Sequence, residues 1–130
     1  EDIGIRNAVV DFRQVEFTHI MENMVYNELR KQGYTVDVGS VESFKRDENG
    51  KLQRRNLEID FVVNRHDERL YIQSAYALPD KEKIDQEQAS LLNVKDGFRK
   101  VIIVGDRYYS NYNEEGIMMM SLFDFLLGTK

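Results

Sequence analysis

The stretch that decides the fold runs from Leu57 to Val63 (LEIDFVV) and resumes from Leu70 to Tyr76 (LYIQSAY). Both segments are rich in β-branched and aromatic residues, and both alternate between apolar and polar positions as strands do. The polar segment Asn64–Arg69 between them predicts a β-hairpin. Strict alternation places one set of side chains on one face, namely Leu57, Ile59, Phe61 and Val63, and the other set opposite, namely Glu58, Asp60 and Val62.

Hairpin pairing brings Asp60 toward Gln73. If Asn64 pairs with Arg69 around the four-residue loop Arg65–Glu68, Asp60 lies directly across from Gln73. Directly opposed residues have Cβ atoms about 4.5–5.5 Å apart, so a carboxylate and an amide oxygen would meet, which is half of a metal site. We predict that Asp60 and Gln73 are neighbours on the sheet face covered by the first helix.

The composition bounds the class of protein. A chain of 130 residues, 42% hydrophobic and 32% charged, fits one globular domain. Its net charge of −5 provides no global basic field for nucleic acid, so such binding requires a local patch. No apolar run reaches the ~18 residues of a membrane span. The absence of cysteine excludes disulfides and thiolate zinc sites and, without a visible signal peptide, favours a cytoplasmic protein.

The N-terminal residues predict an upstream region. The chain opens on Glu1 rather than Met, which suggests a piece of a longer protein. Residues Ile3–Phe12 alternate only in part and are interpreted as a connecting strand or loose lead-in. We therefore treat 1–130 as a single domain whose residues 1–14 lead in from a missing ATPase or helical region.

The remaining elements follow from periodicity and from cap and turn signals. Helices are expected at Phe17–Gln32, closed by Gly33, and at Asp80–Val94, with Ile84, Leu91 and Leu92 on the inner face. Strands are expected at Tyr34–Val41, Lys100–Gly105 and Ile117–Met120. Gly39 suggests a bulge in the first of these strands, and the second is expected to run parallel to a neighbouring strand. Phe44–Asn56, with its Asn49-Gly50 turn, is expected to form an exposed, mobile hairpin tip. Ser121 and Asp124 predict a capped final helix, Leu122–Leu127, ending at Gly128.

The predicted fold class is therefore mixed α/β: a helix, a three-stranded antiparallel meander, a helix and a strand, followed by a short strand and a short helix.

Several carboxylates occupy apolar patterns. Asp60 lies among apolar strand residues, and its simplest interpretation is a pair with Arg54, Arg55 or Gln73. Glu28 falls in the apolar stripe of the first helix, where it either meets a polar group of the sheet or snorkels off the helix end. These carboxylates suggest a polar seam between helices and sheet, formed by Glu28, Glu58 and Glu87 beside Glu22 and Asp60.

Other motifs are missing or isolated. The two histidines, His19 and His66, have no partner at metal-ligand spacing, and no phosphate-binding loop occurs in the sequence. Local positive charge is concentrated around the Asn49-Gly50 turn. The candidates for nucleic-acid binding are Lys45, Arg46, Lys51, Arg54 and Arg55.

Five ordered blocks together resemble the C-terminal domain of a family of prokaryotic AAA-type ATPases. The blocks are Glu22–Leu29, Gly33–Gly39, Glu58–Val62, Tyr71–Tyr76, and Gly116-Ile117 with Asp124–Leu127. The resemblance covers most of the chain, from about Ile3 to Leu127. It implies a restriction-endonuclease-like, PD-(D/E)xK fold, with ATP bound in an upstream module and the protein's own ATPase domain as a partner.

In active members of that fold, three acidic or amide side chains hold Mg²⁺ and a lysine orients the attacking water. When these roles are carried over by position, the resemblance implies Glu22, Asp60 and Gln73 as the Mg²⁺ ligands. The position of the lysine is occupied by Ala75. Gln73 is neutral and a weaker ligand for a hard cation. Lys83 is the one candidate for a migrated lysine.

Two classes of function compete, with a third open. The first is a catalytically inactive recognition or docking domain that needs no cofactor of its own and binds DNA, RNA or a protein partner. The second is a Mg²⁺-dependent nuclease with a degenerate site. A toxin- or antitoxin-like interaction domain is the third. Ala75 favours the first, because loss of a positioned catalytic group removes about 10²–10⁴-fold of rate.

Overall fold

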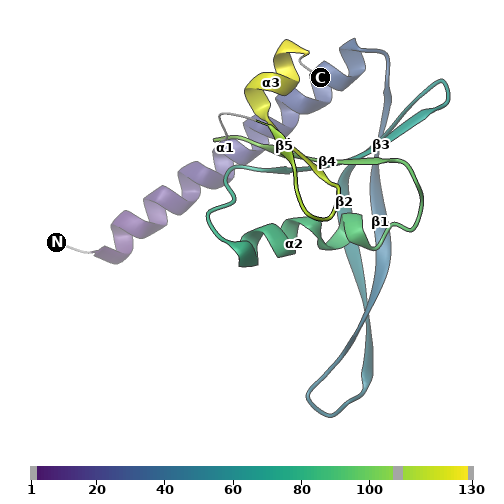
Figure 1. Cartoon of the computed structure of the whole chain (residues 1–130). Coiled ribbons are helices and arrows are strands. Elements are labelled where there is room, and N and C mark those ends of the chain that lie inside the picture. The colour runs from purple at the N-terminus through teal and green to yellow at the C-terminus, as the bar shows by residue number, and fades with distance from the viewer. Residues whose placement is uncertain (1–2, 107–109, 129–130) are drawn as a thin grey trace.

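The computed structural model describes residues 3–106 and 110–128, with side chains from Val15 onward. The helices are α1 (Ile3–Lys31), α2 (Lys81–Leu92) and α3 (Leu122–Leu127), as Figure 1 shows. The strands are β1 (Thr35–Arg46), β2 (Leu52–Arg65), β3 (Glu68–Ala75), β4 (Arg99–Val104), β5 (Asn111–Tyr112) and β6 (Met118–Ser121). The predicted order of helix, meander, helix, strand, strand and helix is confirmed, with β5 as an addition.

The strands form one six-stranded sheet in the order β1-β2-β3-β4-β6-β5. β1, β2 and β3 are the predicted antiparallel meander. β4 joins β3 in parallel after the crossover through α2, which confirms the prediction made for the apolar run. β6 then adds parallel to β4, and β5 pairs antiparallel with β6.

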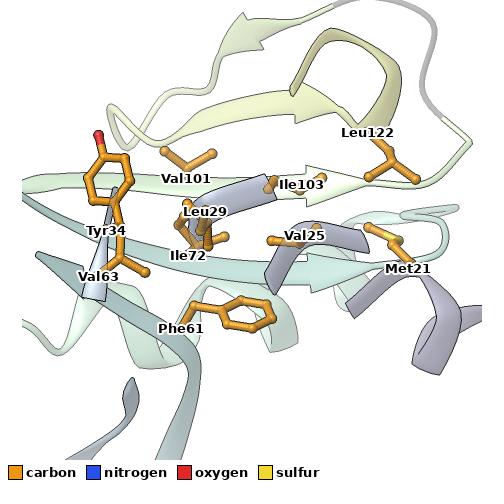
Figure 2. Close-up of a cluster of buried hydrophobic side chains, with 10 residues drawn as sticks. All are labelled: Met21, Val25, Leu29, Tyr34, Phe61, Val63, Ile72, Val101, Ile103 and Leu122. Carbon is orange, nitrogen blue, oxygen red and sulfur yellow. The ribbon is translucent and has the colours of Figure 1, made fainter. Parts of the chain in front are cut away.

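Helices cover both faces of this sheet. On one face, Met21, Val25 and Leu29 of α1, one helical turn apart, pack with Leu122 of α3 against Phe61, Val63, Ile72, Val101 and Ile103 (Figure 2). On the other face, Leu91 of α2 packs against Ile59, Tyr71, Ile102, Val104 and Ile117. The molecule is thus a three-layer α/β/α arrangement, in which every central strand is buried on both sides.

Helix α1 is longer than its apolar pattern indicates. The interpretation of Ile3–Phe12 as a strand or loose lead-in is wrong, because this segment is the first part of α1. Helix growth is cooperative, so residues preceding a helix anchored by Met21, Val25 and Leu29 join it at low cost. The predicted end is confirmed: Gly33 adopts a φ of 92°, and the N–H of Tyr34 donates to the Leu29 carbonyl at 3.0 Å.

The segment around Asn49 forms the tip of an exposed hairpin, as predicted, and its strands pair over most of their length. β1 extends to Arg46 and β2 begins at Leu52, and the two strands remain paired to their ends. The Asp47 carboxylate accepts hydrogen bonds from the N–H groups of Asn49 and Lys51, each at 2.9 Å, and so closes the turn. Figure 1 shows this ribbon projecting away from the body of the sheet.

The second hairpin has the predicted register but a shorter loop. Asn64 pairs with Arg69 as expected, and Arg65 also pairs with Glu68. The loop is therefore His66-Asp67, and His66 adopts the positive φ of 55° that a tight hairpin turn requires.

The caps of the other two helices follow the sequence. Asp80 accepts from the N–H of Lys83 at the start of α2, and Ser121 accepts from the N–H of Asp124 at the start of α3, both at 2.9 Å. The inner face of α2 differs from the expectation: Leu91 is buried with Gln88 and Ser90, whereas Leu92 is 37% exposed. Within residues 3–106 and 110–128, none of the helices has the length and apolar character needed to cross a membrane.

Candidate functional site

A β-bulge positions Asp60. β1 advances two residues, from Asp37 to Gly39, while β2 advances three, from Val62 to Ile59, so the extra residue belongs to β2. In consequence Ile59 packs on the α2 side with Val62, whereas Phe61 packs on the α1 side. The prediction that Ile59 and Phe61 share a face is wrong, because one inserted residue reverses the alternation.

The half-buried Asp60 carboxylate is held by Ser74. Its Oδ2 accepts from the backbone N–H of Ser74 at 2.9 Å and from the Ser74 hydroxyl at 3.2 Å. The expected pair with Arg54 or Arg55 is wrong, since Arg54 instead pairs with Glu42 at 3.5 Å on the ribbon. The partner of this mid-strand acid is therefore a neighbouring strand, not a cation.

Gln73 contacts the backbone of Asp60 rather than sharing a site with its carboxylate. The buried Gln73 Oε1 accepts from the Asp60 N–H at 2.6 Å, and its Nε2 donates to the Glu87 carbonyl of α2 at 3.4 Å. Ser74, the next residue of β3, points the other way and bonds the Asp60 carboxylate. Asp60 and Gln73 are neighbours, but the predicted common face under α1 is wrong, because the bulge rotates Asp60.

Glu22 of α1 faces Asp60. Burial raises the pKa of Glu22, repulsion from Asp60 raises it further, and nearby His19 partly offsets both. Burial also raises the pKa of Asp60, against the lowering effect of the Ser74 hydrogen bonds and with a smaller contribution from Glu58. Two of the three implied ligands are thus brought together, each in an environment that disfavours its ionised form.

The implied Mg²⁺ site does not fit these residues. Both ends of the Gln73 amide are engaged, on the side of α2, which leaves Glu22 and Asp60 as a pair. No three Asp, Glu, His or Cys side chains in the described part of the chain converge at metal-binding distance. Ala75 supplies no cation at the lysine position.

An open cleft of about 730 Å³ lies beside the pair, between α1, the end of β3 and the start of α2. Ser74 and Ala75 form part of its wall, together with Thr18 and Lys83. The Lys83 ammonium bonds Glu87 at 3.1 Å. The candidate for a migrated lysine therefore lies in the same cleft as Ala75, with its charge paired within α2.

The predicted polar seam between helices and sheet is wrong for Glu28, Glu58 and Glu87. Glu28 is half-buried and accepts from the side chain of Gln32, four residues on in α1, at 2.8 Å. Glu87 pairs with Lys83 of α2, and Glu58 is exposed on β2. Helical neighbours at this spacing satisfy a carboxylate without a partner from another layer.

The basic candidates lie on the ribbon and divide between its faces. Directly opposed residues share a face, so Arg54 lies with Phe44 and Arg46 with Leu52 on one side. The other side carries the pairs Ser43 with Arg55 and Lys45 with Gln53. Lys51 lies between the turn and β2. The five residues belong to one element, but they do not form one patch.

Sequence reasoning missed Ser74, whose two hydrogen bonds hold Asp60. The usable signal was Gly39, where a bulge was expected and where the register shift is confirmed. Any Cβ at Gly39 would collide with Cγ2 of Val62, so the glycine permits the close approach of β1 to the bulged strand.

The chain is similar to an uncharacterized protein of Haemophilus influenzae, with 32% identity over 126 residues. The similarity covers 97% of this chain and 27% of that protein, so the chain spans about a quarter of its relative's length. No family model matches the chain.

Proposed function

We propose that this chain is a recognition domain with a restriction-endonuclease-like fold that binds nucleic acid without hydrolysing it. The observation that carries the proposal is the position of Gln73. Its amide links the Asp60 backbone to the Glu87 carbonyl, so it is not free to complete a metal site with Glu22 and Asp60.

The neighbouring positions support the same conclusion. Metal-assisted phosphodiester hydrolysis needs a cation to bind and polarise the phosphate and a group to orient water. Ala75 supplies neither charge nor hydrogen bond, and Lys83 is paired with Glu87. Among the described residues, the Glu22–Asp60 pair therefore has no third carboxylate or histidine that would complete a metal site, and Ala75 replaces the lysine expected beside it.

The fold assignment is supported by topology. A helix, an antiparallel meander, a helix and a parallel strand follow one another in the order that the resemblance implies. Asp60 on the second strand lies within electrostatic range of Glu22 on the first helix, as that fold would place them. A domain that does not hydrolyse nucleic acid can still bind it, because phosphate binding requires only accessible cations.

A Mg²⁺-dependent nuclease is the second candidate, and the Glu22–Asp60 pair favours it. Two half-buried carboxylates that repel each other would be relieved by a cation between them. With two protein ligands, such an ion would retain several waters.

The ATPase context stays a prediction that rests on the sequence resemblance. A relative of which this chain spans 27% has room for an additional domain, such as the expected ATP-binding module. The protein partners of the chain, including its own ATPase domain or a toxin–antitoxin-like partner, also stay predictions.

The proposal is tested by the affinity for a labelled DNA duplex in EDTA and in Mg²⁺, at matched ionic strength. We expect the two affinities to agree within about threefold, and Asp60→Ala to bind like the wild type, because recognition does not use the carboxylate pair. Tighter binding in Mg²⁺ that Asp60→Ala abolishes would establish a working metal site instead.

A further inference from the structure

We propose that the distal part of the β1–β2 ribbon, residues 43–55, inserts into the major groove of duplex DNA, with the Ser43–Arg55 face toward the bases. We call this segment the arm. The inference rests on the proposed function, since it specifies where and in what form nucleic acid binds.

The first observation is a segregation of charge. The arm contains five cations and two carboxylates, a net charge of +3, whereas the whole chain carries −5. The rest of the molecule is therefore at −8 and repels phosphate. Net charge therefore favours the arm over the rest of the chain as the place where a polyanion binds.

The second observation is the shape of the arm. Beyond Phe61, β2 has no ladder partner in β3, and the ribbon continues as two strands that project from the sheet (Figure 1). The β2 residues Leu52–Asn56, farthest from the sheet, are all exposed. Phe44 and Leu52 are 56% and 54% exposed, so no layer of the domain covers them. A major groove about 12 Å wide admits a two-stranded ribbon, and four strand residues at about 3.3 Å each let the arm lie along roughly 13 Å of it.

The third observation is the difference between the two faces. On the Phe44 face, Arg54 is paired with Glu42 at 3.5 Å, and Arg46 donates to the Gly50 carbonyl at 2.8 Å. On the opposite face, Lys45 and Arg55 are exposed and form no ion pair with any residue that the structure describes.

The second face also carries the chemistry of base recognition. Ser43 and Gln53 lie directly across from Arg55 and Lys45, so hydroxyl, amide and cationic groups form one surface. The hydroxyl and amide groups can read base edges, with glutamine selecting adenine, while the cationic groups contact the phosphates that flank the groove. The nearby Asp47 carboxylate is occupied by the turn amides and by Gln53 Nε2 at 3.1 Å.

The expected ligand is DNA rather than duplex RNA. The major groove of an A-form helix is deep and too narrow for side chains to read, so a ribbon cannot enter it. Arg55 and Arg54 provide a matched pair for the test, because they are adjacent, of the same type and on opposite faces.

The experiment measures fluorescence anisotropy of a short DNA duplex and of the RNA duplex of the same sequence, titrated with the chain at several salt concentrations. Arg55→Ala should weaken DNA binding and reduce the salt slope by about 0.9, and adding Lys45→Ala should reduce it by about 0.9 more. Arg54→Ala should reduce the slope less, because Glu42 already offsets its charge.

The RNA duplex should bind at least about tenfold more weakly than DNA. Circular dichroism of each variant checks that the fold is retained.

The experiment distinguishes failure of the arm proposal from failure of the proposed function. If the chain binds DNA but neither Arg55→Ala nor Arg54→Ala changes the slope, or if the RNA duplex binds equally well, the arm proposal is overturned while recognition stands. An equal loss for the two single variants overturns the assignment of the reading face. No salt-dependent binding to either duplex overturns both proposals and leaves a protein partner as the ligand.

Discussion

Gln73 illustrates how a residue at a catalytic position serves the structure. The β2–β3 ladder ends at Phe61 and Ile72, and beyond it the Gln73 amide accepts the hydrogen bond of the Asp60 N–H. The same amide donates to Glu87, a bond that a glutamate could not make. An amide at this position therefore bridges β2 and α2, whereas a carboxylate would serve a metal better.

We predict that Gln73→Ala lowers the free energy of unfolding by about 1–3 kcal/mol, because the Asp60 N–H loses its acceptor in a buried region. Glu28→Ala is the matched comparison. Its half-buried carboxylate meets only Gln32 on the same helix, so the loss should stay under about 0.5 kcal/mol. Urea denaturation measures both variants, and a loss under about 0.5 kcal/mol for Gln73→Ala would show that the hydrogen bonds of Gln73 are dispensable.

Two residue pairs of the candidate site could be predicted. The approach of Asp60 to Gln73 follows from hairpin register, and that of Glu22 to Asp60 was implied by the resemblance. The direction in which Asp60 points could not be predicted, because it depends on a bulge whose extra residue lies on β2, opposite the glycine that signals it. Ser74 was overlooked for the same reason.

Among the elements, β2 has the largest effect on the site, since its bulge moves Phe61 to the α1 layer and leaves Ile59 with α2. The bulge depends on Gly39 of the neighbouring strand, where a side chain would meet the short, branched side chain of Val62. Val62 cannot move away without disturbing the α2 layer, into which it packs.

Gly39→Ala should therefore destabilise the protein by about 1–3 kcal/mol, through overpacking between β1 and β2. Gly97→Ala is the control, because a Cβ at Gly97 meets nothing within 4 Å; its change should lie within about 0.5 kcal/mol. Thermal or urea unfolding measures both. Equal effects would mean that β1 adjusts freely and that the bulge does not need the glycine.

Element boundaries could be predicted where the signal is local. Caps at Asp80, Ser121 and Gly128 and the turn after Asp47 depend on a few adjacent residues, and all lie where the sequence indicates. The first part of α1 could not be predicted, because it depends on the continuation of an anchored helix. The arm was expected as a hairpin tip, but the extent of its strand pairing could not be predicted, since its strands have no buried face to produce a strong alternation.

At the scale of the whole molecule, the two regions that carry candidate functional groups are separate. The Glu22–Asp60 pair belongs to the body of the domain, beside a cleft between α1 and α2, while the accessible cations Lys45 and Arg55 are on the arm. A nuclease needs cations and metal ligands at one phosphate. Their separation is consistent with an arm that binds nucleic acid and a body that does not cleave it.

The central claim, recognition without hydrolysis, is tested most directly by incubating the purified chain with supercoiled plasmid and with single-stranded DNA in Mg²⁺ or Mn²⁺. Asp60→Ala, prepared in parallel, reports any contaminating nuclease, because a contaminant is unaffected by that substitution. We expect wild type and variant to give the same background while the duplex-binding affinity of both is retained. Nicking by the wild type that disappears in Asp60→Ala would contradict recognition without hydrolysis.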